Sequence, residues 1–202
     1  MQVSFKYRLF KKLGVYFSYT STVLWDTKND SSPLRDITFS PEVYYRYTHK
    51  HPAIASIDTG YTHSSNGQDG DDSRGLNRLF VRFNNNIKLN HIHLFLVTNV
   101  YATLSKGAEN QDISDYMGFW DTRMVMMNLF KHEQLTLGLN INSGENGLPF
   151  NRGSYMLDAL YKIQYVDFNP YLYVQYFNGY GETILNYNQK SDKIRVGIAL
   201  YF

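Results

Sequence analysis

Polar and apolar residues alternate along nearly the whole chain. The alternation is clearest in the last segment, where one face carries Ile194, Val196, Ile198, Leu200 and Phe202 and the other carries Lys193, Arg195, Gly197, Ala199 and Tyr201. Successive side chains of an extended strand point to opposite faces, so a period of two predicts strands with one apolar face each. No segment shows a convincing period of 3.6 residues, and the pattern therefore predicts an all-β fold.

Eleven strands are predicted from this alternation. They lie near residues 2–10, 14–25, 39–48, 52–63, 76–86, 91–103, 116–129, 133–143, 153–165, 169–178 and 192–202. The connections between them alternate in length. The short ones lie near 11–13, 49–51, 87–90, 130–132 and 166–168, and the long ones, rich in Asn, Asp, Gly and Ser, near 26–38, 64–75, 104–115, 144–152 and 179–191.

Two features favour a membrane barrel over a soluble sandwich. Strands of about 9–12 residues suit a tilted crossing of the hydrocarbon layer. Short turns at one end and long polar loops at the other are typical of outer-membrane barrels, whose apolar residues face lipid and whose polar residues face the interior. The sequence therefore predicts an antiparallel, up-and-down transmembrane β-barrel, formed as a single domain by residues 1–202, in a bacterial outer membrane. A final strand that ends in Phe also resembles the C-terminal assembly signal of such barrels.

The strand count raises a question about the N-terminus. With Phe202 on the periplasmic side, counting back eleven strands places Met1 on the extracellular side, whereas bacterial single-chain barrels have even numbers of strands. The first residues also lack the apolar run of a signal peptide. We expect that a signal peptide and one N-terminal strand are missing, so that the chain is N-terminally truncated.

Composition narrows the functional classes. The chain has no cysteine, which excludes disulfide scaffolds and thiolate metal sites. Its formal net charge is only +2, so nothing indicates a nucleic-acid partner. Aromatic residues make up 16% of the chain, which suits a barrel with interfacial aromatic girdles. No run of about 18 apolar residues occurs, so no transmembrane helix is predicted.

Three polar residues continue a face that is otherwise apolar. His63 and Ser65 follow Ile57 and Tyr61 on one face of a predicted strand, and Asn77 lies on the apolar face of the return strand. Polar groups on a lipid face are unfavourable and need a reason. A catalytic triad would supply one, with Ser65 as nucleophile, His63 as its base and Asn77 accepting the other imidazole N–H to fix the tautomer.

Taken singly, these residues have ordinary explanations. A histidine near a strand end is more often an interfacial residue, Ser65-Asn-Gly is a turn signal, and Asn77 is a polar residue at a strand end. The acidic loop formed by Asp69, Asp71 and Asp72 is most simply solvated, although Asp71 or Asp72 could contact a cation through water.

The motifs together resemble the outer-membrane phospholipase A family. The stretch Tyr61-Thr-His-Ser-Ser-Asn-Gly, followed by Ser73-Arg-Gly-Leu-Asn-Arg-Leu, is similar to the family's active-site hairpin, with Asn twelve residues after Ser. Further matches occur in the family's order at Ser31-Ser-Pro-Leu-Arg-Asp, Asp115-Tyr-Met-Gly-Phe and Gly179-Tyr-Gly-Glu-Thr. They cover essentially the whole chain, and the family's first strand, one of twelve, has no counterpart.

The resemblance implies an activity and a site. It implies calcium-dependent hydrolysis of phospholipid acyl esters (phospholipase A1, A2 and lysophospholipase) by a homodimer, with Ser65, His63 and Asn77 as the triad. It also implies Ca²⁺ held by the backbone carbonyls of Gln68 and Ser73 and by the hydroxyl of Ser31 from the partner subunit. Gly67 would donate its backbone N–H to the oxyanion. The family has Arg where Gln68 stands, a change that a carbonyl ligand tolerates.

Two alternatives stay open at the level of sequence. A small porin or adhesin would have a wide polar interior and no role for Ser65. The truncated chain could also be an inactive remnant of the enzyme.

Overall fold

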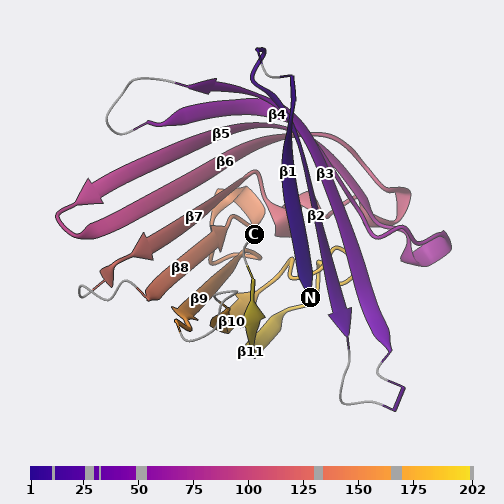
Figure 1. Cartoon of the computed structure of the whole chain (residues 1–202). Coiled ribbons are helices and arrows are strands. Elements are labelled where there is room, and N and C mark those ends of the chain that lie inside the picture. Colours follow the sequence, from indigo (N-terminus) through magenta and orange to yellow (C-terminus); the bar gives the residue numbers. More distant parts are fainter. Residues whose placement is uncertain are drawn as a thin grey trace.

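All the strands belong to a single antiparallel sheet. The computed structural model describes residues 1–10, 12–25, 30–31, 33–48, 54–129, 134–164 and 170–200. Within these residues each strand pairs with its neighbours in sequence (Figure 1). The strands are β1 (Gln2–Phe10), β2 (Val15–Trp25), β3 (Leu34–Thr48), β4 (Ser56–Ser65), β5 (Gly75–Leu89), β6 (Ile92–Lys106), β7 (Trp120–Met127), β8 (Leu135–Asn142), β9 (Ser154–Lys162), β10 (Tyr171–Gly179) and β11 (Ser191–Ala199).

The predicted all-β class is confirmed, and the described residues form the eleven antiparallel strands that the alternation predicts. Several boundaries differ from the prediction. β3 begins at Leu34 rather than near 39, and β4 runs to Ser65 rather than 63, which places the whole His63–Ser65 segment inside a strand. Extended pairing with the neighbouring strands holds these residues in the sheet despite their polar character.

The predicted start of the seventh strand, near 116, is wrong. Ser114–Met117 forms a short helix, α1, and β7 begins only at Trp120. Between them Gly118 has a φ of 44°, and a Cβ there would approach the Ser143 hydroxyl to 2.0 Å. A glycine is therefore needed at this bend, where the chain turns from α1 into the sheet.

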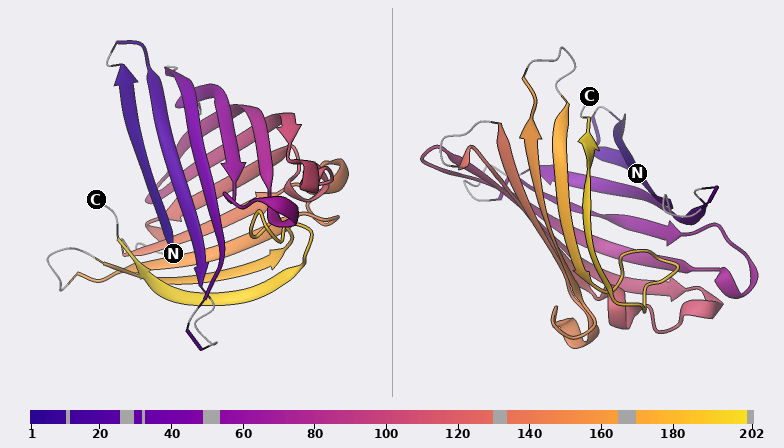
Figure 2. Two further views of the ribbon diagram at one scale, coloured as in Figure 1. Left: turned by 90° about the vertical axis from the view of Figure 1, so that its right-hand side faces the viewer. Right: turned by 90° about the horizontal axis from the view of Figure 1, so that it is seen from below.

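Some predicted features lie outside the described residues: the turns near 49–51, 130–132 and 166–168, and Phe202. Within the described part of the chain, β1 and β11 form the two edges of the sheet, each with a strand partner on one side. The sheet curves round a common interior, as the two turned views show (Figure 2).

The two faces of the sheet are polar inside and apolar outside. Along β4 the buried side chains are Ser56, Asp58, Thr62 and Ser64, whereas Tyr61 on the other face is 39% exposed. The same outward exposure of large apolar side chains recurs around the sheet, for example at Phe5, Val43, Leu79, Leu157 and Val196. This is the arrangement expected of a barrel whose outer surface meets lipid. Among the described residues, no helix is long and apolar enough to cross a membrane.

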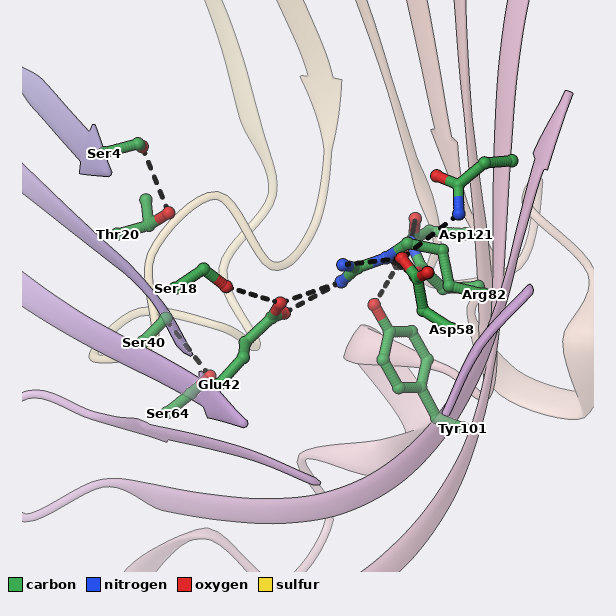
Figure 3. Close-up of polar contacts among 12 residues, drawn as sticks. Ser4, Ser18, Thr20, Ser40, Glu42, Asp58, Ser64, Arg82, Tyr101 and Asp121 are labelled. Carbon is green, nitrogen blue, oxygen red and sulfur yellow. Dashed lines mark hydrogen bonds and ion pairs between the residues drawn. The ribbon is translucent and has the colours of Figure 1, made fainter. Parts of the chain in front are cut away.

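Ion pairs and hydrogen bonds fill the interior. The Arg46 guanidinium donates to both carboxylate oxygens of Asp58 at 2.7 Å. Arg82 donates to both oxygens of Glu42 at 3.0 Å (Figure 3). Asp58 and Glu42 thus each have a cationic partner, which offsets the large free energy of removing a carboxylate from water.

The same kind of pairing continues on the later strands. Tyr101 donates to Asp121 at 2.6 Å, and Arg123 pairs with Asp158 at 2.5 Å. Arg78 also lies in this interior, over the ring of Tyr101 and 3.7 Å from its centroid.

A cluster of buried apolar side chains lies at one end of the sheet. Leu76, Ile113, Ile184 and Tyr187 are all at most 3% exposed and pack together. They come from the start of β5 and from the β6–β7 and β10–β11 connections, which gather at the same end of the molecule (Figure 2). The long connections therefore fold over this end and support the β4–β5 hairpin from inside.

Candidate active site

The β4–β5 hairpin presents its polar residues on the outward face. His63 pairs directly with Asn77 across the hairpin, and Ser65 pairs with Gly75. All three side chains are half-buried and share the face of Tyr61 and Leu79, opposite the inward-facing Thr62 and Ser64. The structure therefore places His63, Ser65 and Asn77 on the outer surface, as the alternation predicts.

The Asn77 amide connects three strands. Its Oδ1 lies 2.7 Å from Nδ1 of His63 and also accepts a hydrogen bond from the hydroxyl of Tyr61. Its Nδ2 donates to the hydroxyl of Ser105 on β6 at 2.9 Å. Because a carbonyl oxygen only accepts, Nδ1 of His63 carries the proton and Nε2 is left as the basic nitrogen. This is the tautomer that a base for a serine hydroxyl requires.

Asn66 organises the loop that follows Ser65. Its side chain, 2% exposed, donates to the carbonyl of Asp72 at 2.7 Å and accepts from the backbone N–H of Arg74 at 2.9 Å. These bonds close the loop around the short helix η1 (Gly70–Asp72). In the sequence Asn66 is recognisable only as part of a turn signal, because its hydrogen bonds to Asp72 and Arg74 form only when the loop folds.

Gly67 needs the freedom of a glycine. Its φ is 66°, in the left-handed region, and a Cβ there would come within 3.1 Å of the Phe39 ring. The residue lies two positions after Ser65, on the exposed surface of the loop. The turn that follows the nucleophile candidate is thus one that other residues adopt only with strain.

The predicted calcium ligands lie in two connections. Gln68 and Ser73 flank η1 in the β4–β5 loop, while Ser31, with a φ of 69°, is exposed in the β2–β3 connection. The structure does not bring Ser31 together with the other two within one chain by any contact among the described residues.

The donors in the loop fit a hard cation. Gln68 and Ser73 offer backbone carbonyls, Ser73 adds a hydroxyl, and Asp69, Asp71 and Asp72 are exposed close by in the sequence; oxygen donors of this kind suit Ca²⁺. The Ser73 carbonyl already accepts from Arg74 Nη1 at 2.9 Å, but a carbonyl has two lone pairs. No group of three or more His, Cys, Asp or Glu side chains in the described residues is placed to hold a metal.

Asn110 anchors the start of β5, although no motif in the sequence distinguishes it. It is fully buried, accepts from the backbone N–H of Gly75 at 3.2 Å and donates to its carbonyl at 2.9 Å. Gly107 N–H reaches the same carbonyl at 2.8 Å. The β6–β7 connection thereby fixes the backbone two residues before Asn77. Its signal in the sequence is a single Asn in a polar loop, which does not distinguish it from solvated neighbours.

An apolar groove runs along the outer surface beside these residues. Its volume is about 650 Å³. Among the side chains that line it are Val43, Thr59, Tyr61, Leu79, Val81 and Val100. The groove lies over Gly60, where a Cβ would meet the Val43 carbonyl at 2.2 Å, so the lack of a side chain brings the backbones of β3 and β4 close together.

The sequence of the chain is similar to those of known proteins. The family model described as phospholipase A1 matches residues 1–200. The chain belongs to the phospholipase A1 family. A curated relative, phospholipase A1 of Escherichia coli (strain K12), is 26% identical over 195 residues, which is 91% of this chain and 61% of the relative. The chain thus spans less than two thirds of the length of such relatives.

Solved structures share the fold of this phospholipase A1 family member. The Salmonella typhi outer membrane phospholipase, solved as a dimer with bound calcium, superposes with a TM-score of 0.84 at 23% identity, covering 99% of this chain and 77% of that one. An E. coli outer membrane phospholipase A with an active-site asparagine replaced by alanine superposes with a TM-score of 0.83, also at 23% identity and with the same coverage of both chains. At this identity the structures establish a shared fold.

Proposed function

We propose that the chain hydrolyses the acyl esters of phospholipids at the outer surface of a β-barrel in the bacterial outer membrane. The observation that carries this proposal is the His63–Asn77 contact on the lipid-facing side of the sheet, two residues from Ser65. Membership of the phospholipase A1 family and the shared fold with an outer membrane phospholipase support it.

In this mechanism Ser65 is the nucleophile. His63 Nε2 takes the proton from the Ser65 hydroxyl as its oxygen attacks the ester carbonyl, and it later returns that proton to the leaving glycerol oxygen. Water then hydrolyses the acyl-enzyme by the same exchange, releasing the fatty acid. Asn77 holds Nδ1–H of His63, so that the imidazole keeps its orientation and its protonation pattern throughout.

The negative charge that develops on the ester carbonyl oxygen during the attack requires a hydrogen-bond donor. We assign this role to the backbone N–H of Gly67, which lies two residues after Ser65 in a left-handed turn. A calcium ion bound by the carbonyls of Gln68 and Ser73, with the Ser31 hydroxyl of a second subunit, would supply further positive charge at this oxygen. We propose accordingly that the active form is a calcium-bound homodimer.

The outer groove suits the acyl chain. Its lining of aliphatic and aromatic side chains begins at Tyr61, beside the candidate triad, and continues along β4, β5 and β6. An acyl chain lying in it stays in apolar surroundings while its ester group reaches Ser65. The interior, by contrast, is crossed by ion pairs such as Arg82–Glu42, which argues against the alternative of a wide passive pore.

The proposal is tested by matched serine substitutions in the chain, refolded in detergent micelles. We expect Ser65→Ala to lower calcium-dependent release of fatty acid by at least about a hundredfold, as loss of a catalytic nucleophile does. Ser64→Ala is the control, because this adjacent hydroxyl faces inward and contacts Ser40 at 3.2 Å. Equal activity of the two variants, or activity unchanged when a chelator removes calcium, would contradict the corresponding part of the proposal.

A further inference from the structure

Three side chains determine how the Asn77 amide lies. His63 and Tyr61, both on β4, approach its carbonyl oxygen, and Ser105 on β6 accepts from its nitrogen at 2.9 Å. The two ends of an amide are nearly equal in size, so packing alone does not choose between them. Hydrogen bonding does choose, because Oδ1 only accepts and Nδ2 only donates.

A β-bulge brings Ser105 to this position. Leu79 pairs with Ala102 and Arg78 with Thr103, but Asn77 pairs with Ser105, so Leu104 is an extra residue in β6. In a regular ladder Leu104 would stand opposite Asn77, since Val100, Ala102 and Leu104 alternate outward. The bulge thus replaces an apolar neighbour of Asn77 with a hydroxyl. Bulges commonly re-aim side chains beside active sites.

We propose that Ser105, assisted by Tyr61, is a positioning residue that keeps the Asn77 carbonyl directed at His63. The inference rests on the proposed function, because the orientation matters only if His63 acts as a base. A reversed amide would direct two N–H groups at the Nδ1–H of the required tautomer. That contact would favour the other tautomer, whose Nε2 carries the proton and cannot take one from Ser65.

The position of the Asn77–Ser105 hydrogen bond on the lipid-facing surface increases its importance. At the boundary with lipid, water is a poor substitute for a missing partner, and a hydrogen bond in a low-dielectric setting is strong. Ser105 is exposed at this surface, as is Tyr61. We therefore expect the Ser105 hydroxyl to accept the hydrogen bond from Asn77 Nδ2 that a water molecule could accept at an aqueous active site.

The test compares Ser105→Ala and Ser105→Thr with the unaltered chain, measuring fatty-acid release from phospholipid micelles. We expect Ser105→Ala to lower kcat by about two- to tenfold with KM unchanged, the size of one lost hydrogen bond. Ser105→Thr keeps the hydroxyl, has space for its methyl group on the exposed face, and should restore kcat. Thr98→Val is a control that removes a hydroxyl from the same outward face of β6, one that contacts Thr122 at 3.1 Å.

The decisive arm is the double variant Asn77→Ala/Ser105→Ala. If Ser105 acts through Asn77, the second substitution has no further effect on kcat in the Asn77→Ala background. A further two- to tenfold loss there, or failure of Ser105→Thr to restore kcat, overturns the inference. A merely structural role of Ser105 would lower the activity of both backgrounds alike.

The role of Ser105 can also be tested independently of enzymatic activity. If the unaltered chain and Ser65→Ala are equally inactive, the function fails, and the side-chain amide resonances of Asn77 then judge the inference by NMR. We expect these resonances to shift in Ser105→Ala and to return toward their original positions in Ser105→Thr. Identical resonances in all three proteins would overturn the inference without any reference to activity.

Discussion

At the scale of single residues, two glycines within strands differ in how much space a side chain would have. A Cβ on Gly138 of β8 would come within 2.3 Å of Arg123 Nη2 and 2.5 Å of Asp158 Oδ2, so the glycine leaves room for an interior ion pair. Gly197 of β11 has nothing within 4 Å of a Cβ. Both glycines lie in regular strands, and only the surroundings distinguish them.

This contrast gives a matched pair of substitutions. We expect Gly138→Ala to destabilise the folded chain by about 1–3 kcal/mol, because the added methyl group displaces the Arg123–Asp158 pair. Gly197→Ala should change stability by less than about 0.5 kcal/mol. Urea unfolding in lipid vesicles measures both, and equal effects of the two substitutions would contradict the packing around Gly138.

At the scale of elements, the β10–β11 connection is tied to the strand that follows it. Glu182, whose side chain is 9% exposed, forms ion pairs with Lys193, at 3.3 Å, and with Arg195. Burial alone would raise the pKa of Glu182. The hydrogen bond from Ser191 and the charges of Arg195 and Lys193 outweigh that effect, so the pKa lies below its ordinary value.

The lowered pKa predicts a pH dependence. A group with a lower pKa in the folded state stabilises that state above its unfolded pKa, about 4.3 for Glu, and the contribution is lost as the pH falls through the folded value. Thermal unfolding between pH 7 and pH 3 should therefore show a smaller acid-induced loss for Glu182→Gln than for the unaltered chain. Glu109→Gln, at an exposed site, is the control and should behave like the unaltered chain.

At the scale of the whole molecule, the sheet has an inverted character. Charged side chains pair inside, and large apolar side chains such as Leu157, 47% exposed, face outward. A surface of this kind is stable in contact with hydrocarbon and unstable in water. The proposed lipid-side chemistry depends on it, because the substrate's acyl chains occupy the same surroundings as the groove.

The loss of stability caused by a charged side chain on the outer face should then depend on its depth in the membrane. We expect Leu157→Arg, in the middle of β9, to destabilise the folded chain in vesicles by about 2–4 kcal/mol. Tyr161→Arg, near the end of the same strand and on the same face, should cost about 0–1 kcal/mol. Equal effects at the two positions would show that this face does not contact hydrocarbon.

The period of two by itself determined the class of fold, the number of strands and the face on which His63, Ser65 and Asn77 lie. These properties follow from local backbone geometry, because the side chains of a strand alternate whatever the strand pairs with. The motif spacing likewise allowed the candidate triad to be proposed, since a hairpin brings residues about a dozen positions apart into register.

Only the tertiary structure decided what depends on pairing between distant segments. The bulge that places Ser105 rather than Leu104 beside Asn77 is a property of the β5–β6 register, and alternation predicts the wrong neighbour. The anchoring of Gly75 by Asn110 and the α1 turn before β7 likewise depend on partners far along the chain. Strand formation is set by a residue's own neighbours in sequence, whereas register and loop packing are set by which segments meet.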